Sequence, residues 1–127
     1  MVDLSGLEAP QRVARDMVRG MLANAPADLK DDVVLVADEL VGNAFEHAGE
    51  ALGISVGVYA WGTVVQVHDS GRDTDRVSRS PARAGHDDVR GRGLLLVNAL
   101  SSAWQVQVDD AGKRVVAVFL HRADGTY

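Results

Sequence analysis

Apolar positions recur at helical spacing through the first part of the chain. Residues 9–23 form one such segment, and Asn24-Ala25-Pro26 ends it because a proline cannot continue a helix. A second helix follows, which we expect Asp28 to cap. The pattern therefore predicts two consecutive amphipathic helices. The apolar face of the second helix comprises Val33, Val36, Ala37, Leu40, Val41, Ala44 and Ala48.

After Gly49 the apolar period changes from about 3.6 residues to about 2, which is typical of strands. Residues 54–58 and 63–68 alternate in this way and are joined by a turn at 60–62. A third helix is expected from Leu94 to about Leu100, followed by two strands at 104–108 and 114–120. This order predicts an α/β (α+β) two-layer sandwich, with a mixed, largely antiparallel sheet and helices packed on one face.

The segment between the two hairpins is long and polar. Residues 69–90 are rich in Gly, Ser, Asp and Arg, and such a loop in a compact domain is usually a functional lid or a disordered segment. We expect a mobile lid at about 73–90 within a single domain spanning 1–127. Trp104 and Phe119 occupy strand positions and are expected in the core.

Composition narrows the possible functions. The chain has no cysteine, which excludes disulfides, thiolate metal sites and a cysteine nucleophile. Its formal charge of −5 argues against nucleic acid or an anionic membrane as the main partner. No leader opens the chain and no apolar run is long enough to span a bilayer, so we expect a cytoplasmic protein.

The second helix also carries a polar flank, formed by Glu39, Asn43 and His47 at intervals of four residues. Such spacing is most often a solvated face. However, asparagine is a mediocre helix former, so its place in mid-helix needs a reason. An amide oxygen that ligates a hard cation would be one.

Two further motifs carry candidate chemistry. Asp69-Ser70-Gly71 places an acid at a strand end before a glycine, an arrangement that also begins ordinary turns. Gly91-Arg92-Gly93-Leu94 places glycines around an arginine at a predicted helix N-terminus. Backbone N–H groups and the positive end of the helix dipole make such a position an anion site, although glycines in a sharp turn are also common.

In this order and at these spacings, the three motifs resemble those of the GHKL superfamily of histidine-kinase-like ATPases, from about residue 10 to residue 120. Glu39 to Ala48 matches the first nucleotide motif, Asp69-Ser70-Gly71 the second and Gly91-Arg92-Gly93-Leu94 the third. The amino-acid sequences of the first and third motifs look most like those of the short bacterial anti-sigma-factor serine kinases.

The resemblance implies a role for each residue. Asn43 would ligate Mg²⁺ and through it ATP, Glu39 would be the catalytic base, and Asp69 with Gly71 would hold adenine. Gly91, Arg92, Gly93 and Leu94 would contact the phosphates, with either Arg92 or Arg90 neutralising charge. His47 is expected to order the helix end rather than to touch the ligand.

This chain departs from the family pattern in two places. After Gly71 it reads Arg72-Asp73, where the second motif commonly has another glycine. Members of the short kinase branch usually begin with a full strand, whereas residues 1–7 are too short and polar for one. We therefore expect an atypical or missing edge strand, which puts dimerisation or partner docking at this sheet margin in doubt.

The resemblance implies a Mg·ATP-dependent serine/threonine protein kinase that binds protein partners, a sigma factor and an anti-sigma antagonist, and that could form a homodimer. A different class of function remains open, namely a regulatory module that binds ATP and protein partners without transferring phosphate. A structural domain with coincidental motifs is the third reading. Loss of Glu39 would distinguish the kinase from the binding module, because it should nearly abolish phosphorylation by a kinase and change nothing measurable in a binding module.

Overall fold

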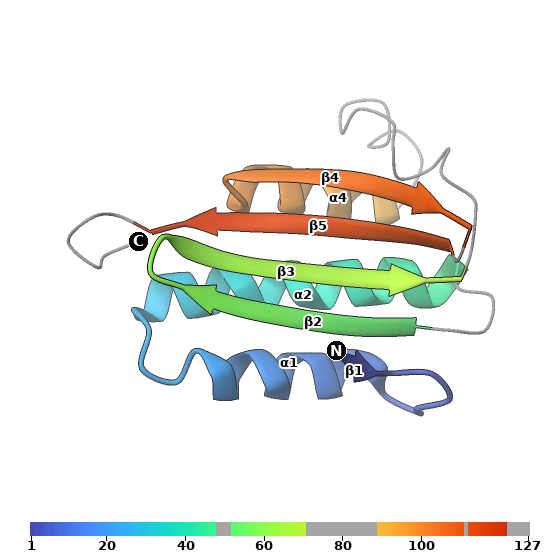
Figure 1. Ribbon diagram of the computed structural model, residues 1–127, viewed down its shortest axis with the longest axis horizontal. Helices are drawn as coiled ribbons and strands as arrows, with labels where there is room; N and C mark the ends of the chain where they lie inside the picture. Colours follow the sequence, from blue (N-terminus) through green and yellow to red (C-terminus); the bar gives the residue numbers. More distant parts are fainter. Residues whose placement is uncertain (48–51, 71–88, 111, 122–127) are drawn as a thin grey trace.

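The computed structural model describes residues 1–47, 52–70, 89–110 and 112–121. Most of the expected lid, together with Ala48 and Gly71, lies outside these residues. The elements alternate as the sequence predicted, helix, helix, hairpin, helix and hairpin, after one additional short strand (Figure 1). They are β1 (Val2–Asp3), α1 (Pro10–Met21), α2 (Ala27–His47), β2 (Leu52–Tyr59), β3 (Gly62–Asp69), α4 (Val89–Leu100), β4 (Ala103–Asp109) and β5 (Gly112–Leu120).

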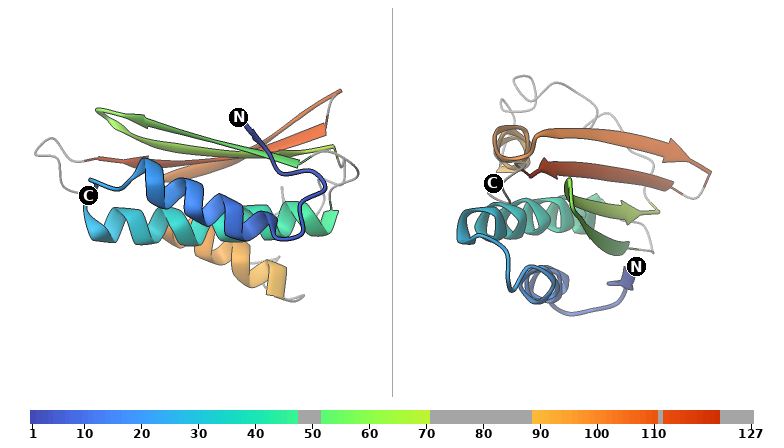
Figure 2. Two further views of the ribbon diagram at one scale, coloured as in Figure 1. Left: turned by 90° about the horizontal axis from the view of Figure 1, so that it is seen from below. Right: turned by 60° about the vertical axis from the view of Figure 1, so that its left-hand side comes forward.

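The described strands form one five-stranded sheet in the order β1-β2-β3-β5-β4, and every pairing between them is antiparallel. Two hairpins, β2–β3 and β4–β5, supply four of the strands, and the pairing of β3 with β5 joins them. The helices lie on one face of the sheet (Figure 2). The predicted fold class is confirmed.

The edge formed by β1 is atypical, as the short polar start of the chain predicted. This strand has two residues, and Val2 pairs with Ile54 while Asp3 pairs with Gly53. The Leu4 N–H then donates to the Leu52 carbonyl at 2.7 Å, and the Leu4 side chain enters the core. A single buried leucine therefore anchors this edge after the strand itself has ended.

The core lies between the helices and the sheet. The predicted apolar face of α2 is buried from Val33 to Ala44, which confirms the helical pattern for the described residues. Alternate residues of the strands meet this face, and Phe119 of β5 is fully buried there. Trp104 packs against the core but is only half-buried, and its indole N–H donates to Asn98 at 3.1 Å.

Two predicted helix boundaries were wrong. The second helix begins at Ala27, so Asp28 lies in its first turn and is not its N-cap. The third begins at Val89 rather than at Leu94, because glycine weakens a helix by only about 1 kcal/mol and packing can offset that cost. Val97 of α4 supplies such packing, since it is fully buried in the core. None of the described helices is long and apolar enough to cross a membrane.

Candidate functional site

The polar flank of α2 lies beside its buried face. Glu39 and Asn43 are half-buried, whereas their neighbours Leu40 and Ala44 are buried in the core. Glu39 and Asn43 are four residues apart on a continuous helix, so their side chains project from the same side. His47 is the last residue of α2, and its side chain lies outside the described part of the chain.

Glu39 has an altered acidity. Its partial burial raises the pKa of the carboxyl group above the ordinary value of 4.5, and the negative charge of neighbouring Asp38 raises this pKa further. A carboxylate with a raised pKa is a better proton acceptor, which is what a general base requires. The electrostatics of α2 therefore agree with the role that the resemblance implies for Glu39.

Helix α1 holds this part of α2 in place. The Arg15 guanidinium donates to the Asp38 carboxylate at 2.5 Å, and the Gln11 amide donates to the Asp38 carbonyl at 3.1 Å. Gln11 also lies against Gly42, where a Cβ would come within 2.8 Å of its Nε2 atom. The glycine thus lets the two helices approach closely one turn after Asp38.

Asp69 is the last residue of β3, as predicted, and only 2% of it is exposed. It faces Lys113, the cross-strand partner on β5, which is 3% exposed. Lys113 Nζ lies 4.0 Å from Asp69 Oδ2, so the two charges form a buried ion pair. Lys113 is a residue that the sequence reasoning missed.

A signal for Lys113 was present in the sequence. Lys113, Val115, Ala117 and Phe119 are spaced by two, so the strand period places the lysine on the face that carries three core residues. Starting the predicted strand at Arg114 removed Lys113 from that pattern. The structure starts β5 at Gly112 and restores it.

Gly112 brings the start of β5 against the end of β3. Its φ of +139° is a conformation that residues with a side chain rarely adopt. A Cβ at this position would lie 2.0 Å from the Asp69 carbonyl oxygen and 2.8 Å from the Ser70 Cα. Only glycine therefore permits this approach of the two backbones, and it fixes Lys113 opposite Asp69.

The third motif begins α4. Gly91, Arg92, Gly93 and Leu94 lie within the first turns of this helix, after Val89 and Arg90, and their side chains are outside the described residues. The helix packs against α2. The C-terminal end of α2, the C-terminal end of β3 and the N-terminal end of α4 all lie at the same end of the molecule, on the right in Figure 1 and in the left view of Figure 2. The fold thus gathers the three motifs.

The donor set at this end fits a metal that arrives with its own ligands. Within the ranges that the structure describes, no three His, Asp or Glu side chains cluster closely enough to hold a metal ion. Mg²⁺ typically uses one or two protein oxygens and completes its shell with water and phosphate. A single amide oxygen, such as that of Asn43, would fit this kind of coordination.

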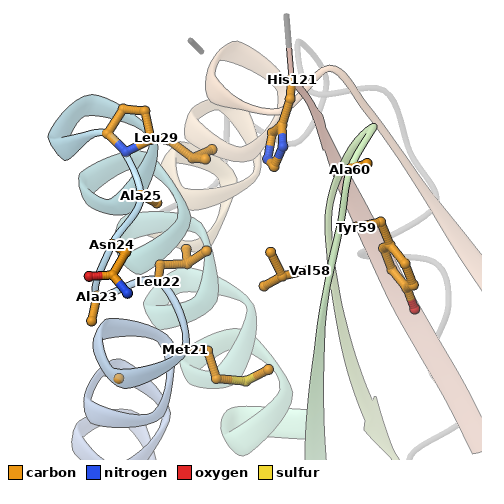
Figure 3. Close-up of a pocket in the computed structure, with 12 residues that line it drawn as sticks. Met21, Leu22, Ala23, Asn24, Ala25, Leu29, Val58, Tyr59, Ala60 and His121 are labelled. Carbon is orange, nitrogen blue, oxygen red and sulfur yellow. The ribbon is translucent and has the colours of Figure 1, made fainter. Parts of the chain in front are cut away.

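A separate apolar pocket of about 350 Å³ lies at the opposite end of the molecule. It opens between the α1–α2 turn and the β2–β3 hairpin, and Leu22 and Val58 point toward each other across it (Figure 3). Tyr59 lies on the other side of β2 and stacks on Trp61 with ring centroids 5.2 Å apart. None of the predicted site residues lines this pocket.

Comparison with known proteins agrees with the geometry. The family model of the histidine kinase-like ATPase domain matches residues 5–119. A chain of the SiaB-SiaC complex from Pseudomonas aeruginosa has the same fold, with a TM-score of 0.69, 20% identity, and coverage of 92% of this chain and 86% of that one. No curated protein matches the sequence significantly.

Two histidine kinases also share the fold. The histidine kinase domain of the blue-light activated kinase from Erythrobacter litoralis EL346 matches with a TM-score of 0.59 and 18% identity, over 87% of this chain and 63% of that one. The kinase AdeS of Acinetobacter baumannii matches with a TM-score of 0.54 and 14% identity, over 86% of this chain and 64% of that one. This chain spans less than two thirds of either kinase structure.

Proposed function

This chain belongs to the family of histidine kinase-like ATPase domains, and on that premise we propose that it binds Mg·ATP and acts as a regulatory serine/threonine protein kinase. The observation that carries the proposal is the place of Glu39 one helical turn before Asn43 on α2, and the raised pKa of Glu39 supports it. This spacing would pair a proton acceptor with a cation ligand in the C-terminal half of α2, and that helix ends at the same end of the molecule as β3 and the start of α4.

Each candidate site residue would contact a different part of Mg·ATP. Asn43 would hold the metal through its amide oxygen, Asp69 would accept a hydrogen bond from the adenine amino group, and Gly71 would allow the base to approach. The backbone of Gly91, Arg92, Gly93 and Leu94 would contact the phosphates at the start of α4. Bound Mg²⁺ supplies charge neutralisation on the phosphate oxygens.

Glu39 would act on the nucleophile. Its carboxylate accepts the proton of a serine or threonine hydroxyl on a partner protein while that oxygen bonds to the γ-phosphorus. The bond from the γ-phosphorus to the bridging oxygen breaks, and ADP leaves. Phosphoryl transfer requires mainly positioning and electrostatic stabilisation, so this small set of residues is sufficient.

We propose protein partners of two kinds, a sigma factor that the protein would bind and an anti-sigma antagonist that it would phosphorylate. The fold is shared with a chain crystallised as the SiaB-SiaC complex, which supports engagement with another protein. The uncovered face of the sheet supplies area for such contacts, with half-buried or exposed side chains such as Val116, Val118 and Leu120 on β5.

The first test is calorimetric titration with ATP, with and without Mg²⁺. The wild-type protein should bind ATP with an affinity that depends on Mg²⁺, and Asn43→Ala should lose this dependence. Asn24→Ala is the matched control, because Asn24 is exposed and lies in the pocket at the other end of the molecule. Undiminished Mg·ATP affinity in Asn43→Ala would refute the metal assignment.

A second test separates a kinase from a binding module. Glu39→Gln should still bind Mg·ATP but should nearly abolish ADP formation and the transfer of labelled γ-phosphate to co-purified protein. Glu8→Gln, an exposed acid before α1, should change neither. If Glu39→Gln leaves both reactions unaltered, or if the wild-type protein catalyses neither, the role is that of a non-catalytic ATP-binding module.

A further inference from the structure

We propose that Lys113 reads the nucleotide base together with Asp69, its ammonium donating to N1 of adenine while the carboxylate accepts from the 6-amino group. The inference rests on the proposed function, since it concerns the same nucleotide site. It adds a specificity-determining residue that lies outside the three sequence motifs.

The first argument is position. Lys113 is the direct cross-strand partner of Asp69, so both side chains lie on the helix-facing side of the sheet. Each is almost fully buried, and their charged atoms are 4.0 Å apart. Any group that reaches the Asp69 carboxylate therefore comes within reach of the Lys113 ammonium.

The second argument is energetic. Burying a lysine and an aspartate costs several kcal/mol per ion, and their mutual attraction often does no more than offset this cost. At 4.0 Å the pair is also longer than a direct hydrogen bond. A buried ion pair is therefore weak evidence for a stabilising role, and its place beside a predicted ligand contact favours a role in recognition.

The third argument is chemical complementarity. Adenine presents a donor at its 6-amino group and an acceptor at the adjacent N1 atom, in that order along one edge. A carboxylate accepts and an ammonium donates, so Asp69 and Lys113 supply the matching order. Guanine presents an acceptor and then a donor at the same two positions. Its contacts with the Asp69 carboxylate and with the Lys113 ammonium would therefore both be unfavourable.

The fourth argument is preorganisation. Gly112 holds the start of β5 against the Asp69 carbonyl, in a backbone conformation that only glycine adopts readily. The next residue is Lys113, so its Cα is fixed relative to Asp69. A pair placed by backbone contacts before the ligand arrives loses little freedom on binding.

The test uses the wild-type protein and base analogues, each as the Mg²⁺ complex, in calorimetric titrations. The 1-deaza analogue of ATP lacks the N1 acceptor and should bind about 10- to 100-fold more weakly than ATP, the range for one charge-assisted hydrogen bond. The 7-deaza analogue keeps N1 and the amino group and should bind as ATP does.

The Lys113→Met variant assigns the effect to the lysine. In this variant ATP and its 1-deaza analogue should bind equally, whereas Arg114→Met should keep the wild-type ratio. Arg114 is the matched control, because it is the next residue of β5 and lies on the opposite face of the sheet. If Lys113→Met does not fold by circular dichroism, Lys113→Thr takes its place.

The outcomes separate the two claims. Equal affinity of the wild-type protein for ATP and the 1-deaza analogue overturns the role of Lys113 and leaves the proposed function standing. The same conclusion follows if the 1-deaza penalty persists in Lys113→Met. A wild-type protein that binds none of the three nucleotides overturns the proposed function, and the inference fails with it.

Discussion

Replacing Gly112 with alanine should destabilise the protein more than any other glycine-to-alanine change considered below. The new Cβ would lie 2.0 Å from the Asp69 carbonyl oxygen. Carbon and oxygen atoms that are not bonded approach to about 3.3 Å, so one backbone must move by more than about 1 Å. The atoms in contact belong to the main chain of β3, and no rotamer change can relieve the clash.

The loss of folding stability in Gly112→Ala has two parts. A φ of +139° strains a residue that carries a side chain by about 1–3 kcal/mol. Forcing the two strands apart adds about 1–3 kcal/mol, the range for overpacking. The sum is a large share of the roughly 5–15 kcal/mol that stabilises a typical domain. For a chain of this length, a loss of about 2–6 kcal/mol corresponds to a fall in Tm of roughly 6–30 °C.

Two other glycines serve as controls and separate these parts. Gly6 has a φ of +74°, and a Cβ added there would meet open space, so Gly6→Ala should lose only about 1–2 kcal/mol of stability through backbone strain. Gly20 lies in α1 with open space and no positive φ, so Gly20→Ala should stabilise the helix by about 0.5–1 kcal/mol.

Thermal and urea unfolding followed by circular dichroism would rank the three variants. We expect Gly20→Ala above the wild type, Gly6→Ala slightly below it and Gly112→Ala far below. If Gly112→Ala unfolds at the same midpoint as Gly6→Ala, the close approach of β5 to Asp69 is not a feature of the folded protein. Nucleotide affinity, measured where the variant is still folded, should fall as well because Asp69 is displaced.

Three further outcomes follow from the structure. The pKa of Glu39 is raised in the folded protein, so the stability that Glu39 contributes is full below the ordinary pKa of 4.5 and declines as pH rises through the folded pKa. Glu39→Gln should therefore have a higher Tm than the wild type at neutral pH, and the difference in Tm should disappear below pH 4.5. A difference in Tm that does not change with pH would contradict this. Phe119→Ala should cost about 3–5 kcal/mol in urea unfolding, since Phe119 is fully buried, whereas exposed Leu120→Ala should stay within about 0.5 kcal/mol. Arg15→Ala should cost less than about 1 kcal/mol of stability, because the ion pair between Arg15 and Asp38 is partly exposed. It should also shift the pH profile of any Glu39-dependent reaction to higher pH, since the negative charge of Asp38 would then raise the pKa of Glu39 without a neighbouring cation. An unchanged profile would show that Asp38 does not affect the pKa of Glu39.

Local patterns in the sequence were enough for much of the fold. The apolar face of α2 and the alternation in β2, β3 and β5 correspond to buried positions, because each pattern reports which side of an element meets the core. Phe119 was correctly assigned to the core on this basis. The order of the elements then restricted the architecture to helices on one face of an antiparallel sheet.

The ion pair at the candidate site could not be read in the same way. Asp69 and Lys113 are far apart in sequence, and only the register of β3 with β5 places them opposite each other. That register is set by tertiary packing and by Gly112, whose φ of +139° no local rule assigns. The motifs found Asp69, Asn43 and Glu39, but a contact between distant strands requires the fold.

The pairing of β3 with β5 also bears on how the chain folds and how its length can vary. Among the described strands, it alone joins the two hairpins, each of which pairs residues that are near in sequence. Hairpins form in about 1–10 μs, so closing the long connection between β3 and β5 is the slower step. The entropy of that closure grows only with the logarithm of its length, and doubling it costs about 0.6 kcal/mol. Insertions between β3 and α4 should therefore alter the folding rate more than the register that sets Lys113 opposite Asp69.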